Sequence, residues 1–169
     1  MNRRGITLME LIIVMAIIAL AAVLMVPNIA GWLPNYRLRS ATRDVVSAMR
    51  VAQMKAVARN VDHRVTFDTG EGSFFIMRRT TAGVNNWVRI TVSDEVAAGA
   101  NDAKQFLPTG VQFDAVNLAG NCAEFSPNST APNITPGVQD NVVIKNSKGT
   151  QKTLFIGRST GRVSIDQRP

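Results

Sequence analysis

Residues 1–27 read MNRRGITLMELIIVMAIIALAAVLMVP, a short basic segment followed by an apolar stretch. The stretch runs from Ile6 to Val26, which is 21 residues, and only Thr7 and Glu10 interrupt it. As a helix with a rise of about 1.5 Å per residue it would be about 30 Å long, which matches the hydrocarbon core of a bilayer. We therefore expect a membrane-spanning helix at the start of the chain.

The length of this stretch argues against an ordinary secretory signal, whose apolar core is about 7–15 residues long. Ala21 and Ala22 are small enough for a cleavage site, but the apolar run continues past them. Basic residues lie on both sides of the stretch, with Arg3 and Arg4 directly against it and a second group from Arg37 onwards. Because the first pair is the nearer one, we expect the N-terminus on the inner side of the membrane.

Glu10 is the one charged residue inside the apolar stretch. A carboxylate at the centre of a membrane helix costs about 2.5–3.5 kcal/mol on insertion scales, so a compensating interaction is expected. One interpretation is a side chain near the interface that reaches water. The other is a functional role that repays this cost.

Length and composition predict one globular domain and argue against several classes of protein. The chain has 169 residues, of which 46% are apolar and 18% charged, so wholesale disorder is not expected. Cys122 is the one cysteine and His63 the one histidine, so the sequence predicts no disulfide, no thiolate metal site and no cofactor. It also shows no nucleotide-binding or hydrolase motif, and we expect neither an enzyme nor a small-molecule substrate. The net charge of +7 favours acidic partners.

After the apolar stretch, the sequence predicts a joint and then an amphipathic helix. Pro27 and Pro34 each remove a helix hydrogen bond, and Gly31 lies between them, so a kinked or partly unwound segment is expected. Beyond it, apolar residues recur at steps of three and four through about Arg59, which marks one buried helix face. The members of this face are Leu38, Ala41, Val45, Ala48, Met49, Ala52 and Ala56.

Three arginines lie on the opposite side of that helix. At 100° per residue, Arg39, Arg43 and Arg50 fall within about 40° of one another, with Asp44 as the nearby acidic residue. They form either a solvated face or a surface that contacts acidic patches on neighbouring subunits.

After Val61 the apolar period changes from that of a helix to that of strands. Short β-branched and aromatic runs alternate with turn sequences such as DTGEG and AGVNN, which predicts an antiparallel meander and an α+β fold. Loops are expected at 93–104 and 126–137. About eight strands are predicted, at 63–68, 73–79, 87–92, 111–116, 122–125, 141–145, 151–156 and 162–165.

The N-terminal pattern resembles the class III leader of type IV pilins and type II secretion pseudopilins. It has Gly5 before an apolar residue, Glu10 five positions further on, an apolar run and then Pro27. The resemblance implies cleavage by a prepilin peptidase after Gly5, methylation of the new terminus at Ile6, and assembly into a filament through Glu10 and the terminal amine of a neighbour. Most members begin with Phe where this chain has Ile6. Loss of the leader would leave 17 basic side chains against 12 acidic ones.

The C-terminal part resembles the FimT/GspH group of minor pilins and pseudopilins in LPTGVQF, AEFSPN and TLFIGRSTGRVSI. This resemblance implies a head of two antiparallel sheets packed on the helix. It favours a FimT-like minor pilin that primes a type IV pilus. The alternatives are a GspH-like pseudopilin of a type II secretion pseudopilus, or a major filament subunit.

In DNA-uptake members of the group, duplex DNA is bound by a Gly-Arg-x-Arg motif near the C-terminus. This chain has Gly161 and Arg162, but Ser164 stands in place of the second arginine. Five basic residues of the tail are candidates for phosphate contacts without sequence preference, on the expectation that the turn at 159–161 brings several of them onto one rim. They are Lys148, Lys152, Arg158, Arg162 and Arg168.

Together these patterns divide the chain into a leader at 1–5, a membrane and filament-core helix at 6–27, a kinked joint and amphipathic helix at 28–60, and a globular β head at 61–169. The resemblance implies a bacterial inner-membrane protein with its head in the periplasm, later part of a pilus or pseudopilus. The expected partners are prepilin peptidase, other pilin subunits and duplex DNA.

Overall fold

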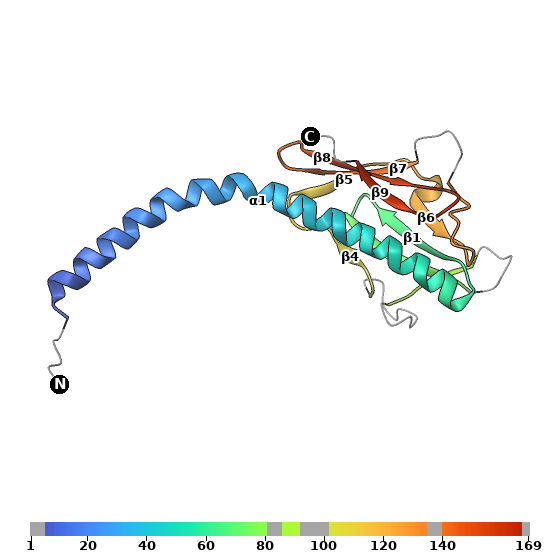
Figure 1. The fold of residues 1–169 in the computed structure, drawn as a ribbon, viewed down its shortest axis with the longest axis horizontal. Coiled ribbons are helices and arrows are strands. Elements are labelled where there is room, and N and C mark those ends of the chain that lie inside the picture. Colours follow the sequence, from blue (N-terminus) through green and yellow to red (C-terminus); the bar gives the residue numbers. More distant parts are fainter. Residues whose placement is uncertain (1–5, 81–85, 92–101, 135–139, 167–169) are drawn as a thin grey trace.

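One long helix carries a head of two antiparallel sheets (Figure 1). The structure, a computed structural model, describes residues 6–80, 86–91, 102–134 and 140–166, with the backbone alone for 24–30. The predicted α+β architecture is therefore confirmed. In chain order the elements are α1 (Leu8–Arg59), β1 (His63–Asp68), β2 (Ser73–Arg79), β3 (Trp87–Arg89), β4 (Gln105–Phe106), β5 (Val111–Val116), η1 (Ala119–Asn121), β6 (Cys122–Phe125), β7 (Asn141–Asn146), β8 (Gln151–Ile156) and β9 (Val163–Asp166).

α1 is 52 residues long and has defined ends. The Thr7 hydroxyl accepts a hydrogen bond from the Glu10 backbone N–H at 3.2 Å, and Asn60 ends the helix with a φ of 53°. The helix is unbroken through Pro27 and Pro34, so the expected unwinding between them is wrong. Figure 1 instead shows a gradual curve in the part that precedes the head, because a helix can lose the hydrogen bond at a proline, bend, and remain helical.

The second half of α1 lies on the head through the face that the sequence predicts. All seven apolar residues of that face are at most 4% exposed. Four of them are alanines, and their small side chains let the strands approach the helix axis closely. The helix contacts strands of both sheets, most extensively β1 and β7.

Each sheet follows a simple antiparallel order. The five-stranded sheet has the order β3-β2-β1-β6, with β4 also paired to β2, and the four-stranded sheet has the order β5-β7-β8-β9. The two sheets share one core, in which the rings of Phe67 on β1 and Phe113 on β5 meet edge to face with centroids 5.5 Å apart. The edge strand β5 is interrupted by a bulge between Phe113 and Ala115.

The strand predictions hold with small differences at the ends. β4 was not predicted, because it has two residues, both exposed, and so lacks the alternation that marks a half-buried strand. The turn sequence DTGEG forms a turn in which the Asp68 carboxylate accepts hydrogen bonds from the N–H groups of Gly70 and Glu71 at 3.0 and 3.1 Å. The AGVNN turn and the expected loops at 93–104 and 126–137 lie wholly or partly outside the described residues.

Candidate functional site: an exposed helix half and a basic groove

The first half of α1 exposes its apolar side chains instead of burying them. From Ile6 to Val23, every side chain except that of Ala21 is exposed, and the exposed fractions of the large apolar ones run from 47% to 80%. Figure 1 shows this half extending away from the head, so the head does not cover it. A contiguous apolar surface of this size marks a site of contact with lipid or with other proteins.

Within the described part of the chain, no helical segment combines the length and the apolar character that a membrane crossing requires. The predicted span at 6–27 includes residues 24–30, whose side chains are not described, and it stays a prediction.

Glu10 lies in the first turn of α1, where the helix dipole stabilises a negative charge. It is exposed, and no side chain pairs with it in the described part of the chain. Ile6 precedes the capping residue Thr7 and is 80% exposed. Gly5 and the rest of the predicted leader lie outside the described residues. Glu10 is thus available to a group from outside this chain.

Two of the tail cations, Lys148 and Arg158, lie apart from the others, and the grouping of the rest as a DNA-binding rim stays a prediction. Lys148 lies in the turn between β7 and β8, and Arg158 follows the other end of β8, which puts the two turns about 20 Å apart along a six-residue strand. Lys148 donates a hydrogen bond from Nζ to the Gly31 carbonyl of α1 at 2.8 Å. Arg158 lies beside Thr130 and Pro132, and Arg168 lies outside the described residues.

Lys152 and Arg162 instead lie beside the helix arginines. One hollow is lined by Arg39, Arg43 and Lys152, and a second by Arg50 and Arg162. Ile165 of β9 lines both hollows, so they adjoin each other between α1 and the β8–β9 hairpin, and we call the two together the α1–β9 groove. The sequence missed this grouping because the helix and the tail are more than 100 residues apart.

The α1–β9 groove is strongly basic. None of its five cations forms an ion pair within the described residues, whereas Arg79, Lys104 and Lys145 elsewhere on the head each pair with a carboxylate. Neither Asp44 nor Asp166, the acidic residues nearest in sequence, lines either hollow. Within the described residues, the groove is therefore a concentration of positive charge without ion-pair partners.

A glycine allows the turn between β8 and β9 to pack closely against the helix at this groove. Gln53 of α1 donates from Nε2 to the carbonyls of Thr160 at 2.9 Å and Ser129 at 3.3 Å. Gly161 has a φ of 58°, and a Cβ there would lie 2.6 Å from the Ser129 carbonyl oxygen and 2.7 Å from Gln53 Nε2. Gly161 of the TGRV sequence thus permits the close approach that places Arg162 over α1.

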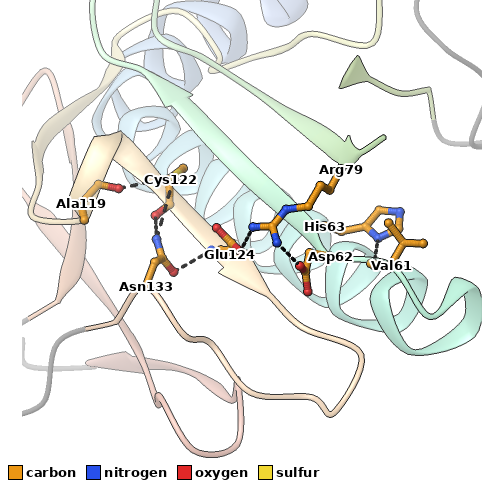
Figure 2. A network of polar contacts seen from close by, with 8 residues as sticks. All are labelled: Val61, Asp62, His63, Arg79, Ala119, Cys122, Glu124 and Asn133. Atoms are coloured by element: carbon orange, nitrogen blue, oxygen red, sulfur yellow. Dashed lines mark hydrogen bonds and ion pairs between the residues drawn. The ribbon is translucent and has the colours of Figure 1, made fainter. Parts of the chain in front are cut away.

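A second polar cluster lies on the five-stranded sheet and has a structural role (Figure 2). Arg79 bridges Asp62 at 2.6 Å and Glu124 at 2.7 Å, and the His63 ring contacts the Val61 carbonyl at 2.7 Å. Burial raises the pKa of the Glu124 carboxyl above its ordinary value of 4.5, and Arg79 opposes that rise. Burial likewise raises the pKa of the Cys122 thiol, which keeps it protonated and unreactive.

The Asn133 amide closes the free edge of β6. Its Nδ2 donates to the Cys122 carbonyl at 2.6 Å, and its Oδ1 accepts from the Glu124 N–H at 2.9 Å (Figure 2). One side chain thus satisfies two backbone groups that a further strand would otherwise pair with. Among the described residues, no three potential metal ligands come together in this cluster or elsewhere.

Comparisons with known proteins agree with this architecture. Residues 1–26 match the family model of the prokaryotic N-terminal methylation motif. A 65-residue segment is 35% identical to type II secretion system protein H of Xanthomonas campestris pv. campestris, and the match spans 38% of this chain and 38% of that protein.

Two solved structures share the fold. The type IV minor pilin FimU of Pseudomonas aeruginosa matches with a TM-score of 0.51 and 17% identity, over 78% of this chain and 90% of that one. The minor pseudopilin EpsH from the type 2 secretion system of Vibrio cholerae matches with a TM-score of 0.53 and 11% identity, over 76% of this chain and 95% of that one. At these identities the likeness establishes the fold.

The methylation motif at the start of the helix and the head of two antiparallel sheets make this chain similar to type IV pilin-like proteins. The partial match to protein H and the shared fold make the chain similar to minor pilins and pseudopilins.

Proposed function

We propose that this chain is a structural subunit, without enzymatic activity, that is built into a type IV pilus or a type II secretion pseudopilus through the first half of α1. The observation that carries the proposal is the exposed apolar surface from Ile6 to Val23, which the head leaves uncovered. Exposed apolar area costs about 25 cal/mol per Å², so this surface needs lipid before assembly and neighbouring helices afterwards.

The proposed processing follows from the N-terminal motif. Cleavage after Gly5 makes Ile6 the new terminus, one residue before the helix cap at Thr7, and methylation then modifies its amine. Glu10 pairs with the amine of a neighbouring subunit, because an anion and a cation that are buried together avoid the cost of burying either alone. Before assembly the protein is anchored in the inner membrane with its head in the periplasm.

Mass spectrometry of membrane-extracted protein tests the processing. The expected chain begins at Ile6 and carries one methyl group on its amine. An intact Met1 terminus in cells with an active prepilin peptidase would contradict it.

Filament incorporation tests the pairing. Glu10→Val is expected to insert into the membrane as well as wild type, because it removes a charge from an apolar stretch, but to be largely absent from sheared filaments or from the pseudopilus. Met15→Val is the matched control, since it changes a residue of the same stretch without altering charge. Equal incorporation of the Glu10 and Met15 variants would overturn the pairing.

The favoured host is a type IV pilus, in which the chain helps to prime the filament; the alternative is a type II secretion pseudopilus. Complementation separates the two, because a minor pilin restores surface pili to its own deletion strain, whereas a pseudopilin restores secretion. High abundance in sheared filaments would favour a major subunit instead.

Duplex DNA binding for uptake is the finer proposal, and it is supported by the exposed tail arginines Arg158 and Arg162, which line separate hollows. Contacts to phosphates give affinity without sequence preference and a steep loss of binding with salt. The replacement of Arg158 and Arg162 together by Gln is expected to lower both the affinity and the salt dependence, measured by fluorescence anisotropy with a labelled duplex. Unchanged binding would remove DNA from the proposal.

A further inference from the structure

The α1–β9 groove combines two features that are separate elsewhere on the head: unpaired cations and an unpaired strand edge. We propose that it binds an extended acidic segment of a neighbouring subunit, which adds to the four-stranded sheet as a fifth strand beside β9. That the segment comes from a neighbouring subunit rests on the proposed function. That the segment is extended and acidic rests on the groove alone.

The free edge of β9 follows from its pairing. β9 pairs with β8 alone among the described residues, and the Gly157 N–H donates to the Arg162 carbonyl at 2.9 Å. Because hydrogen-bonded and non-hydrogen-bonded pairs alternate in an antiparallel ladder, Ser164 and Asp166 bond to β8. The N–H and C=O groups of Val163 and Ile165 therefore point away from β8, towards the open side.

The other sheet edges are either protected against such pairing or too short for it. The Asn133 amide occupies the edge of β6, and a bulge interrupts β5. β3 and β4 have three and two residues. Natural proteins use such devices to prevent strand addition, and β9 has neither a covering side chain nor a bulge within the part of the chain that the structure describes.

The charges around this edge select an acidic occupant. Arg39 and Arg43 lie about 6 Å apart along the helix axis, close to the separation of about 6.6 Å between alternate residues of a strand. Arg39 and Arg50 are about 16 Å apart, which is the length of about five extended residues. A strand with acidic side chains at alternate positions would therefore face these arginines while its backbone pairs with Val163 and Ile165.

A peptide fits these observations better than a nucleic acid does. The lining of the groove includes apolar Val46 and Ile165 beside its cations, and the free N–H and C=O groups of β9 have the spacing of a strand. A sugar-phosphate backbone has no alternating N–H donors with which to complete that ladder.

Full-length protein in detergent micelles can be titrated with an acetylated and amidated octapeptide of alternating Glu and Thr. We expect micromolar binding that weakens with salt. The same peptide with Gln in place of Glu tests the charge. A version N-methylated at alternate residues keeps the charge and removes the N–H groups that pair with β9. We expect both altered peptides to bind at least tenfold more weakly.

Protein variants locate the site. Arg43→Gln is expected to raise the Kd of the Glu/Thr peptide about two- to fivefold, and Arg43→Gln with Arg50→Gln by more. Arg158→Gln is the matched control, because it removes an exposed arginine outside the groove, and it should leave the Kd unchanged. Amide signals of Val163 and Ile165 should shift on binding.

Three results would overturn the inference. Equal affinity for the N-methylated peptide would exclude strand addition, equal affinity for the Gln peptide would exclude charge selection, and tighter binding of a 20-base-pair duplex that competes with the peptide would assign the groove to DNA. None of these results bears on Glu10 and filament incorporation, so the two proposals fail independently.

Discussion

At the scale of single residues, Gly161 determines whether the tail can reach the helix. Its φ is positive, and a Cβ at this position would come so close to Ser129 and Gln53 that no side chain fits. Gly149 offers a matched comparison, because it also has a positive φ, of 80°, but a Cβ there would meet nothing within 4 Å.

Gly161→Ala is therefore expected to destabilise the head by about 2–4 kcal/mol, from the left-handed backbone and the steric overlap together. Gly149→Ala should cost about 1–2 kcal/mol, from the backbone alone. Urea unfolding of the head measures both. An equal loss for the two variants would show that the contact between Gln53 and the 159–161 turn contributes nothing.

Glu124 gives a prediction about pH. Its pKa is raised in the folded state, so the folded protein holds the proton more tightly than the unfolded chain, and the free energy of unfolding falls as pH rises from 4.5 to the raised pKa. Glu124→Gln cannot titrate. The stability of wild type relative to Glu124→Gln should therefore decrease with rising pH across this window, as measured by thermal unfolding. A relative stability that increases instead would contradict the burial argument.

At the scale of elements, the edge of β6 depends on one side chain. Asn133→Ala removes two hydrogen bonds, each worth about 0.5–1.5 kcal/mol, and exposes the Cys122 carbonyl and the Glu124 N–H. The expected result is a loss of about 1–3 kcal/mol in urea unfolding together with self-association in light scattering. Asn128→Ala is the control, since it alters a local turn bond in the same loop without opening an edge. Self-association of both variants would point to loop disruption instead.

The elements that could be predicted from sequence are those whose apolar residues recur at a clear period. The buried face of α1 follows a step of three and four residues from Leu38 to Ala56, and eight of the nine strands show β-branched or aromatic runs. β4 could not be found because its two residues are exposed. The unwinding expected at Pro27 and Pro34 was wrong because a long helix can bend at a proline without ending.

At the scale of the whole molecule, the candidate site shows that charged residues close together in the sequence need not lie close together in the structure. Ile6 and Glu10 belong to a local motif that the sequence alone reveals, and residues 1–26 match the model of that motif, while the roles of the two residues stay predictions. The arrangement of the tail cations could not be predicted, because a hairpin sends residues close in sequence to opposite ends of its strands, as with Lys148 and Arg158. Tertiary packing of β8 and β9 on α1, which no local pattern encodes, brings Lys152 of β8 to Arg39 and Arg43.

The junction between helix and head defines where an independent head begins. Asn146 donates from Nδ2 to Asn35 Oδ1 at 2.9 Å, and Lys148 reaches the Gly31 carbonyl. A head expressed from Gly31 should be monomeric and unfold cooperatively, and it should be about 1–2 kcal/mol more stable than one expressed from Arg37, which lacks both bonds. Sedimentation and urea unfolding provide the comparison. Equal stability would show that the junction bonds contribute little.

These two junction bonds also determine how a mechanical load reaches the head. The helix from Leu8 to Gly31 is a lever arm of about 35 Å, and the contacts at Gly31 and Asn35 are about 6 Å apart along its axis. A sideways force at the tip is therefore multiplied about sixfold where the turn between β7 and β8 holds the helix. The helix before this fulcrum is curved and carries Pro27, so bending is absorbed there before it strains the sheets.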